Sequence, residues 1–142
     1  TVLPESFGQL TALQSVALHQ NQLTALPGSF GQLTALRVLL LGDNKLLKLP
    51  ENFGQLMSLQ TLELQRNHLA VLPESFGQLA VSHRLLLNEN PLTTLPERFG
   101  SFMATCSVRL GLKLRIRVWA LQFLRQLFQK QKHTLPPVEG TT

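Results

Sequence analysis

The chain has 142 residues, of which 44% are hydrophobic, so it is long and apolar enough for one domain with a packed core. The net charge of +5 is uneven, with −1 in residues 1–98 and +6 in residues 99–142. A single cysteine excludes an intrachain disulfide, and no apolar run approaches the roughly 18 residues that cross a bilayer, so we expect a cytoplasmic protein.

A Leu-Pro pair recurs every 23 residues and divides the chain into repeats. The pairs begin at Leu3, Leu26, Leu49, Leu72 and Leu95. A Phe-Gly pair keeps the same step, beginning at Phe7, Phe30, Phe53, Phe76 and Phe99. Residues 1–12 form the second half of a repeat that lacks its strand. This half repeat is expected either to follow a removed cap or to act as the cap itself.

Each full repeat begins with a predicted strand, because the last two leucines of Leu-x-x-Leu-x-Leu are two apart and point to one side of an extended chain. An asparagine ends each strand, and stacked amides are expected to satisfy backbone groups where the chain leaves the sheet. These structural asparagines are Asn21, Asn44, Asn67 and Asn90.

A short helical turn is expected to follow each strand, on the other side of the coil. Its proline suits the first helical position, and the glutamate after it, as in Pro50-Glu51, favours the positive end of that turn. The glycine after each phenylalanine is expected to let the backbone bend back.

The full unit reads Leu-x-x-Leu-x-Leu-x-x-Asn-x-Leu-x-x-Leu-Pro-x-x-Phe-Gly-x-Leu, as from Leu36 to Leu56, and the pattern extends to about residue 104. It resembles the 23-residue leucine-rich repeats of intracellular Ras-group proteins and of effectors that intracellular bacterial pathogens deliver into host cells. The resemblance implies an α/β leucine-rich-repeat solenoid, a right-handed curved stack with a short parallel β-sheet on its concave face. It also implies protein binding by that face, as when ribonuclease inhibitor covers an enzyme's active site. The partner would be a host protein or another effector, and a bacterial effector would be secreted into the host cytosol.

The repeat weakens toward the C-terminus, where Lys113 stands in place of asparagine. We expect a solenoid over residues 1–113, comprising a half repeat, four full repeats and one degenerate repeat. A basic amphipathic capping helix is predicted over 114–133 and a loose tail over 134–142. Alternating apolar residues over 108–118 favour a strand instead at the boundary. Peripheral membrane attachment through the basic helix is the alternative function.

The predicted partner-binding residues lie on the outward side of the strands and just beyond their ends, where the coil does not fix residue identity. Val38, Leu40 and Leu86 are apolar where solvent is expected, so they are candidate anchors inside a charged rim. Mixed charge on this face argues against nucleic acid. The predicted site comprises Arg37, Val38, Leu40, Asp43, Glu63, Gln65, Arg66, His83, Arg84, Leu86, Asn88 and Glu89.

Catalysis has one candidate, because His83 and Cys106 are 23 residues apart and would lie roughly 5 Å apart on neighbouring strands. The sequence supplies no orienting carboxylate or oxyanion donor beside them, so no enzyme is expected. The histidine spacing and the single cysteine predict no metal site, and the glycines form no nucleotide-binding loop. No cofactor and no small-molecule substrate are expected.

Overall fold

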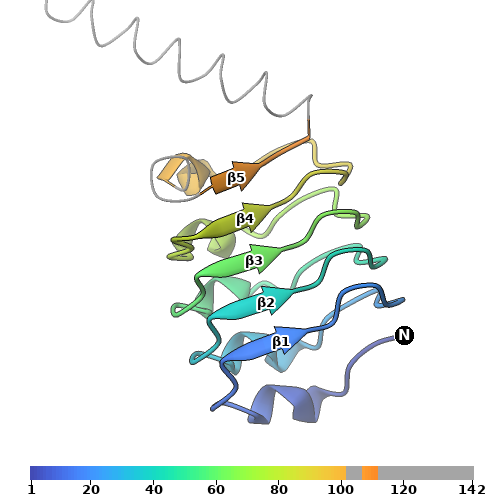
Figure 1. The fold of residues 1–142 in the computed structure, drawn as a ribbon, viewed down its shortest axis with the longest axis vertical. Helices are drawn as coiled ribbons and strands as arrows, with labels where there is room; N and C mark the ends of the chain where they lie inside the picture. The colour runs from blue at the N-terminus through green and yellow to red at the C-terminus, as the bar shows by residue number, and fades with distance from the viewer. Residues whose placement is uncertain (102–106, 112–142) are drawn as a thin grey trace, which may run out of the picture.

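The computed structural model describes residues 1–101 and 107–111, in which successive 23-residue units stack as turns of a coil (Figure 1). One side of the stack is a sheet in the parallel order β1-β2-β3-β4-β5. Its strands are β1 (Ser15–Ala17), β2 (Val38–Leu40), β3 (Thr61–Glu63), β4 (Arg84–Leu86) and β5 (Ser107–Arg109). The predicted helix over 114–133, the tail over 134–142 and Cys106 lie outside the described residues.

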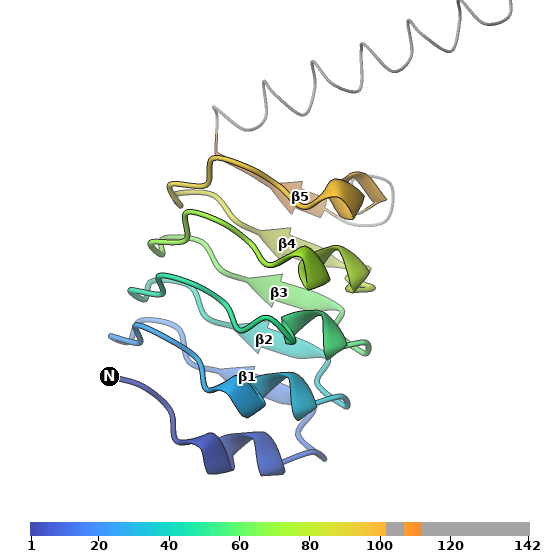
Figure 2. The same cartoon turned by 180° about the vertical axis from the view of Figure 1, so that it is seen from behind.

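The opposite side of each coil is a 3₁₀ turn, and these turns form the second layer of the stack (Figure 2). They are η1 (Glu5–Gln9), η2 (Gly28–Gln32), η3 (Phe53–Gln55), η4 (Glu74–Gln78) and η5 (Glu97–Ser101). With three to five residues each, they are shorter than an α-helix needs for stability. The predicted helical turns are therefore confirmed as 3₁₀ turns.

The prolines of these turns differ from the prediction, whereas the glutamates Glu5, Glu74 and Glu97 lie in the first turn as predicted. Pro4 occupies the position before η1 rather than the first helical position. Glu5 binds the next coil, because its carboxylate accepts hydrogen bonds from the backbone N–H groups of Gly28 at 3.0 Å and Ser29 at 2.9 Å. The bonds from Ser29, followed by the bond from Gly28, lower the pKa of Glu5 below its ordinary value.

The core is a dry column between the two layers, filled by the repeating leucines and phenylalanines. Neighbouring phenylalanine rings stack with centroids 5.9 to 6.4 Å apart and continue into the half repeat, where Phe7 lies on Phe30. Val2 of the same half repeat pairs with Ala25 of the next coil. Because each buried leucine contributes about 1.5–3 kcal/mol and touches neighbouring coils, stability depends on the stack rather than on a single coil.

The asparagine ladder predicted from the sequence is confirmed for Asn44, Asn67 and Asn90, each of which ties its own coil to the preceding one, whereas Asn21 bonds within its own coil. The Nδ2 group of Asn67 donates to the carbonyl of Leu41 at 2.9 Å and to that of Leu64 at 3.1 Å, and its Oδ1 accepts from the N–H of Leu46 at 2.9 Å. Asn44 and Asn90 repeat the pattern. The ladder therefore satisfies backbone groups at the turn, as expected.

The glycines that follow the phenylalanines leave little room for a Cβ, and the reason is contact between coils rather than the backbone bend expected from the sequence. The described glycines all have negative φ, so the backbone turns without using the left-handed region. A Cβ on Gly31 would instead lie 2.5 Å from the carbonyl oxygen of Asn52 in the next coil, and one on Gly54 would collide with the carbonyl oxygen of Ser75. Glycine is required here because adjacent coils approach closely.

Candidate functional site

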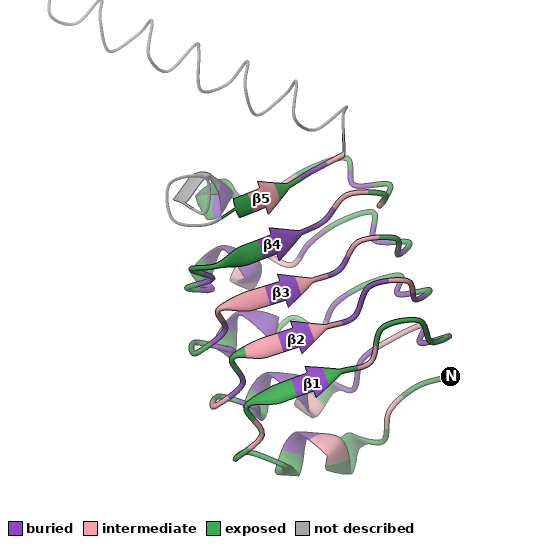
Figure 3. Ribbon diagram, in the orientation of Figure 1, coloured by how far each residue is buried: buried purple, intermediate pink, exposed green. Residues whose placement is uncertain are grey.

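The candidate site is the open face of the sheet, which carries the strand side chains that point away from the core. Side chains alternate along β2 and β3, so Leu39 and Leu62 point inward and are fully buried. Their neighbours Val38, Leu40 and Glu63 are partly exposed on the open face (Figure 3). Neighbouring strands keep a register of 23 residues, so outward side chains line up in rows across the sheet. The predicted site residues on the strands therefore share one surface.

Leu86 is the exception, since the sequence analysis expected it to be exposed and it is only 7% exposed. It alternates with the core residue Leu85, which places it on the open face, and its register neighbours are Glu63 and Arg109. Both neighbours have long side chains whose methylene stems can cover a leucine between them. Of the three predicted anchors, Val38 and Leu40 are accessible and Leu86 is not.

Glu63 lies in the middle of the open face, between Leu40 and Leu86 in the register. Its carboxylate is 3.4 Å from the Nε of Arg84. The side chain of Arg84 is 54% exposed and that of Glu63 only 20%. The carboxylate is therefore partly desolvated, and Arg84 is its one ion-pair partner among the described residues.

A second set of charges lies beyond the strand ends, where Arg66 bridges carboxylates from the coils on either side. Its Nε donates to Glu89 at 3.0 Å, and its Nη1 lies 3.4 Å from Asp43. The hydrogen bond and charge of Glu89, followed by those of Asp43, raise the pKa of Arg66 above its ordinary value. All three side chains were predicted in the site, and the structure joins them in an ionic ladder across three coils.

The backbone explains why these three side chains align. Gln20, Asp43, Arg66 and Glu89 all adopt φ between 54° and 57°, a left-handed conformation that is uncommon outside glycine. Each directly precedes a ladder asparagine, so the same turn recurs in every coil and projects the same position at the edge of the sheet. The sequence carries no glycine or asparagine at these four positions to indicate this conformation, and Asp43 alone is of a residue type enriched in it.

Two amide side chains, Gln65 and Asn88, occupy adjacent coils between Glu63 and the ionic ladder. The Gln65 amide lies over Gly42, where an added Cβ would collide with Nε2. Asn88 donates its Nδ2 to Glu89 at 3.2 Å. The Oε1 of Gln65 and the Oδ1 of Asn88 are buried and have no hydrogen-bond partner within the described part of the chain. The sequence identified both residues but not their unpaired acceptors.

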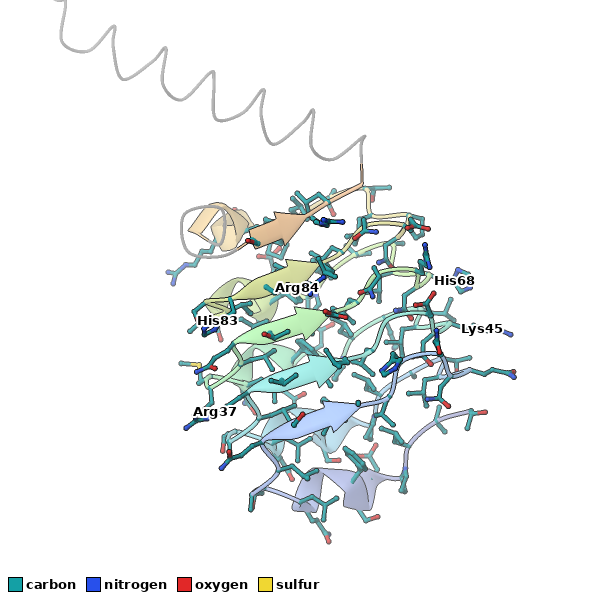
Figure 4. All side chains as sticks on the ribbon, viewed as in Figure 1. Arg37, Lys45, His68, His83 and Arg84 are labelled. Atoms are coloured by element: carbon teal, nitrogen blue, oxygen red, sulfur yellow. The ribbon has the colours of Figure 1, made fainter. Side chains whose placement is uncertain are left out.

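Arg37 and His83 lie two coils apart on the same edge of the sheet, just before β2 and β4 begin and away from the ionic ladder (Figure 4). Both are exposed, and the Nδ1 of His83 is 3.1 Å from the Oγ of Ser82. Thr61 is not in the predicted partner-binding set, although it is an outward strand position of the repeat and its register between Val38 and Arg84 puts it on the same face.

The described residues also bear on metal binding, on membrane spanning and on the predicted pair of His83 and Cys106. They contain no group of three histidine, cysteine or acidic residues that could hold a metal ion. No helix among them is long and apolar enough to cross a membrane. The predicted neighbour of His83, Cys106, is outside the described residues, so the pair has no structural description.

Comparison with known proteins identifies the repeat. The family described as Leucine rich repeat matches residues 1–46, and a second family of the same description matches residues 58–79. Comparison with curated proteins found no significant match. A solved structure of a leucine-rich-repeat protein from Leptospira interrogans is 39% identical over 77% of this chain, with a TM-score of 0.68. The match covers 28% of the length of that Leptospira chain.

Proposed function

Because the chain is a leucine-rich-repeat protein, and such domains generally mediate protein–protein interaction, we propose that it binds a protein partner through the open face of its sheet. The observation that supports this choice of face is the partly exposed apolar pair Val38 and Leu40 inside a set of charged side chains. An apolar centre with a polar rim is the arrangement that protein interfaces commonly show.

The size of the face limits the partner's footprint. Strands in a sheet are about 4.8 Å apart, so a stack of this depth spans roughly 20 to 25 Å. A single loop or one small domain fits that span. On the resemblance to bacterial effectors, the proposed partner is a host protein or another effector whose active site this chain covers. The proposed compartment is the cytosol, of the producing cell or of a host cell.

The proposal is tested by one substitution on the open face and a matched one elsewhere in the same coil. Leu40→Glu places a charge at the proposed centre, whereas Leu47→Glu makes the same change at a residue that is 62% exposed and lies beyond the strand, between Asn44 and Pro50. Leu86 is unsuitable, because a glutamate in its 7% exposed position would bury a charge and destabilise the fold.

Affinity capture with mass spectrometry should recover a specific protein with the wild type and with Leu47→Glu, and lose it with Leu40→Glu. Thermal unfolding of both variants should stay close to that of the wild type, since neither residue is in the core. Equal recovery by Leu40→Glu would show that binding uses another surface.

A further inference from the structure

The centre of the open face contains hydrogen-bond acceptors that are not fully used, and these bear on the chemistry of the partner. One of them is Glu63, whose side chain is 20% exposed and whose only ion-pair partner among the described residues, Arg84, is 3.4 Å away. At that distance, much of the acceptor capacity of the carboxylate stays available.

Two further acceptors lie close to Glu63 in the fold. Gln65 is two residues along the same coil, and Asn88 occupies the equivalent position in the next coil. Their oxygens are buried and have no hydrogen-bond partner among the residues that the structure describes, a condition that is unfavourable in a folded protein. Both residues are partly exposed, and the terminal torsion of an amide side chain is soft, so a small rotation would present each oxygen to an incoming donor.

The charges paired next to Glu63 leave room for a cation. The ion pairs join three carboxylates, those of Asp43, Glu63 and Glu89, to two guanidinium groups, those of Arg66 and Arg84. Two further arginines belong to the open face but not to this group, since Arg37 precedes Val38 at the other end of β2 and Arg109 lies one strand beyond Leu86. Within the paired group, one carboxylate charge is not balanced.

We infer that the partner places an arginine or lysine side chain on Glu63, with its methylene stem against Leu40. This inference rests on the proposed binding by the open face and adds the chemistry of what binds there. Guanidinium and ammonium groups carry only donors, so they match a site composed of a carboxylate and two unpaired amide oxygens. Their long apolar stems suit a charged centre bordered by leucine.

The experiment uses a phage-displayed library of linear and disulfide-looped random peptides, selected on the full chain. Peptides whose binding is lost with Leu40→Glu and kept with Leu47→Glu are directed to the open face. These peptides should share an arginine or lysine at one fixed position. Glu63→Gln should weaken their binding at least tenfold, and replacing the shared basic residue by glutamine should add little to that loss, because both changes remove the same pair.

Glu74→Gln is the matched control, since Glu74 is exposed in the η4 turn on the opposite side of the coil and its replacement should leave affinity unchanged. Three results would overturn the inference while leaving open-face binding intact. In the first, the peptides directed to the open face share no basic residue, and in the second they share an acidic residue. In the third, replacing the shared basic residue weakens binding to the Glu63→Gln variant as much as it weakens binding to the wild type. Failure to select any peptide that depends on Leu40 would refute the proposed function, and the inference with it.

Discussion

Replacing Asn67 by alanine tests whether the asparagine ladder holds the coils together. Asn67 is 3% exposed and supplies the hydrogen-bond acceptor for the N–H of Leu46 in the preceding coil. The carbonyls of its two shorter bonds are better protected, because Leu41 also accepts from Asn44 and Leu64 also accepts from Asn90. The substitution therefore leaves one buried N–H without a partner and removes one of two bonds at each carbonyl.

The expected cost follows from that count. An unpaired buried N–H costs about 1–3 kcal/mol, and each of the two shared bonds contributes about 0.5–1.5 kcal/mol, so Asn67→Ala should lower the free energy of unfolding by about 2–6 kcal/mol. Asn21→Ala provides the comparison within the same column. Asn21 is exposed and donates only to the carbonyls of Leu18 and His19 in its own coil, so its loss should cost about 1 kcal/mol or less.

Urea unfolding followed by circular dichroism measures both variants, with the free energy extrapolated linearly to zero denaturant. Such a loss is a large share of the 5–15 kcal/mol that stabilises a typical domain, so the Asn67 variant should unfold at a clearly lower urea concentration. Equal losses for the two variants, or a loss below about 1 kcal/mol for Asn67→Ala, would refute the explanation of the ladder as satisfying buried backbone groups.

Two further predictions use the glycines and the pH. Gly54→Ala should lower the free energy of unfolding by about 1–3 kcal/mol, because the added Cβ collides with the Ser75 carbonyl. Gly28→Ala should change it little, because the nearest atoms lie 3.9 Å from its added Cβ. Similar melting temperatures for the two variants would contradict the argument that adjacent coils approach closely at Gly54. The pKa of Glu5 is lowered in the folded state, so its carboxylate stabilises the fold above the ordinary glutamate pKa of about 4.3, and this stabilisation is lost as the pH falls through the folded pKa. Glu5→Gln should therefore destabilise the protein near neutral pH and less below about pH 4. Melting temperatures at pH 7 and pH 3 test this, and an equal difference between wild type and variant at both pH values would contradict it.

The fold was predictable because its determinants are local and repeated. The 23-residue step fixed the strand register, since Val16, Leu39, Leu62 and Leu85 pair as the spacing requires. The asparagine ladder followed from the same step and from the amide's ability to donate and accept. The role of glycine was not accessible in this way, because a close approach between coils depends on their separation in space rather than on the residue's own torsions.

The candidate site was predictable in position and only partly in detail. Alternation along the strands placed Val38 and Leu40 on the open face correctly. The burial of Leu86 depends on side chains from two other strands, Glu63 and Arg109, and no pattern within one repeat encodes it. The unpaired oxygens of Gln65 and Asn88 likewise result from side-chain packing across coils, which a repeat alignment does not describe.

Folding energy alone does not account for the charged side chains at the edge of the site. A left-handed conformation costs about 1–2 kcal/mol in a residue with a side chain, whereas glycine would avoid this cost and lose about 0.5–1 kcal/mol through backbone entropy. Arg66 and Glu89 adopt this conformation and form an ion pair in which both side chains are more than half exposed, and such pairs contribute about 0–1 kcal/mol. A glycine and an ion-paired charged residue at this position are therefore nearly equal in folding energy, so stability alone does not select the charged side chains. A partner that docks on the open face would select them, because charges at the rim of an interface determine which partners are accepted and how fast they associate.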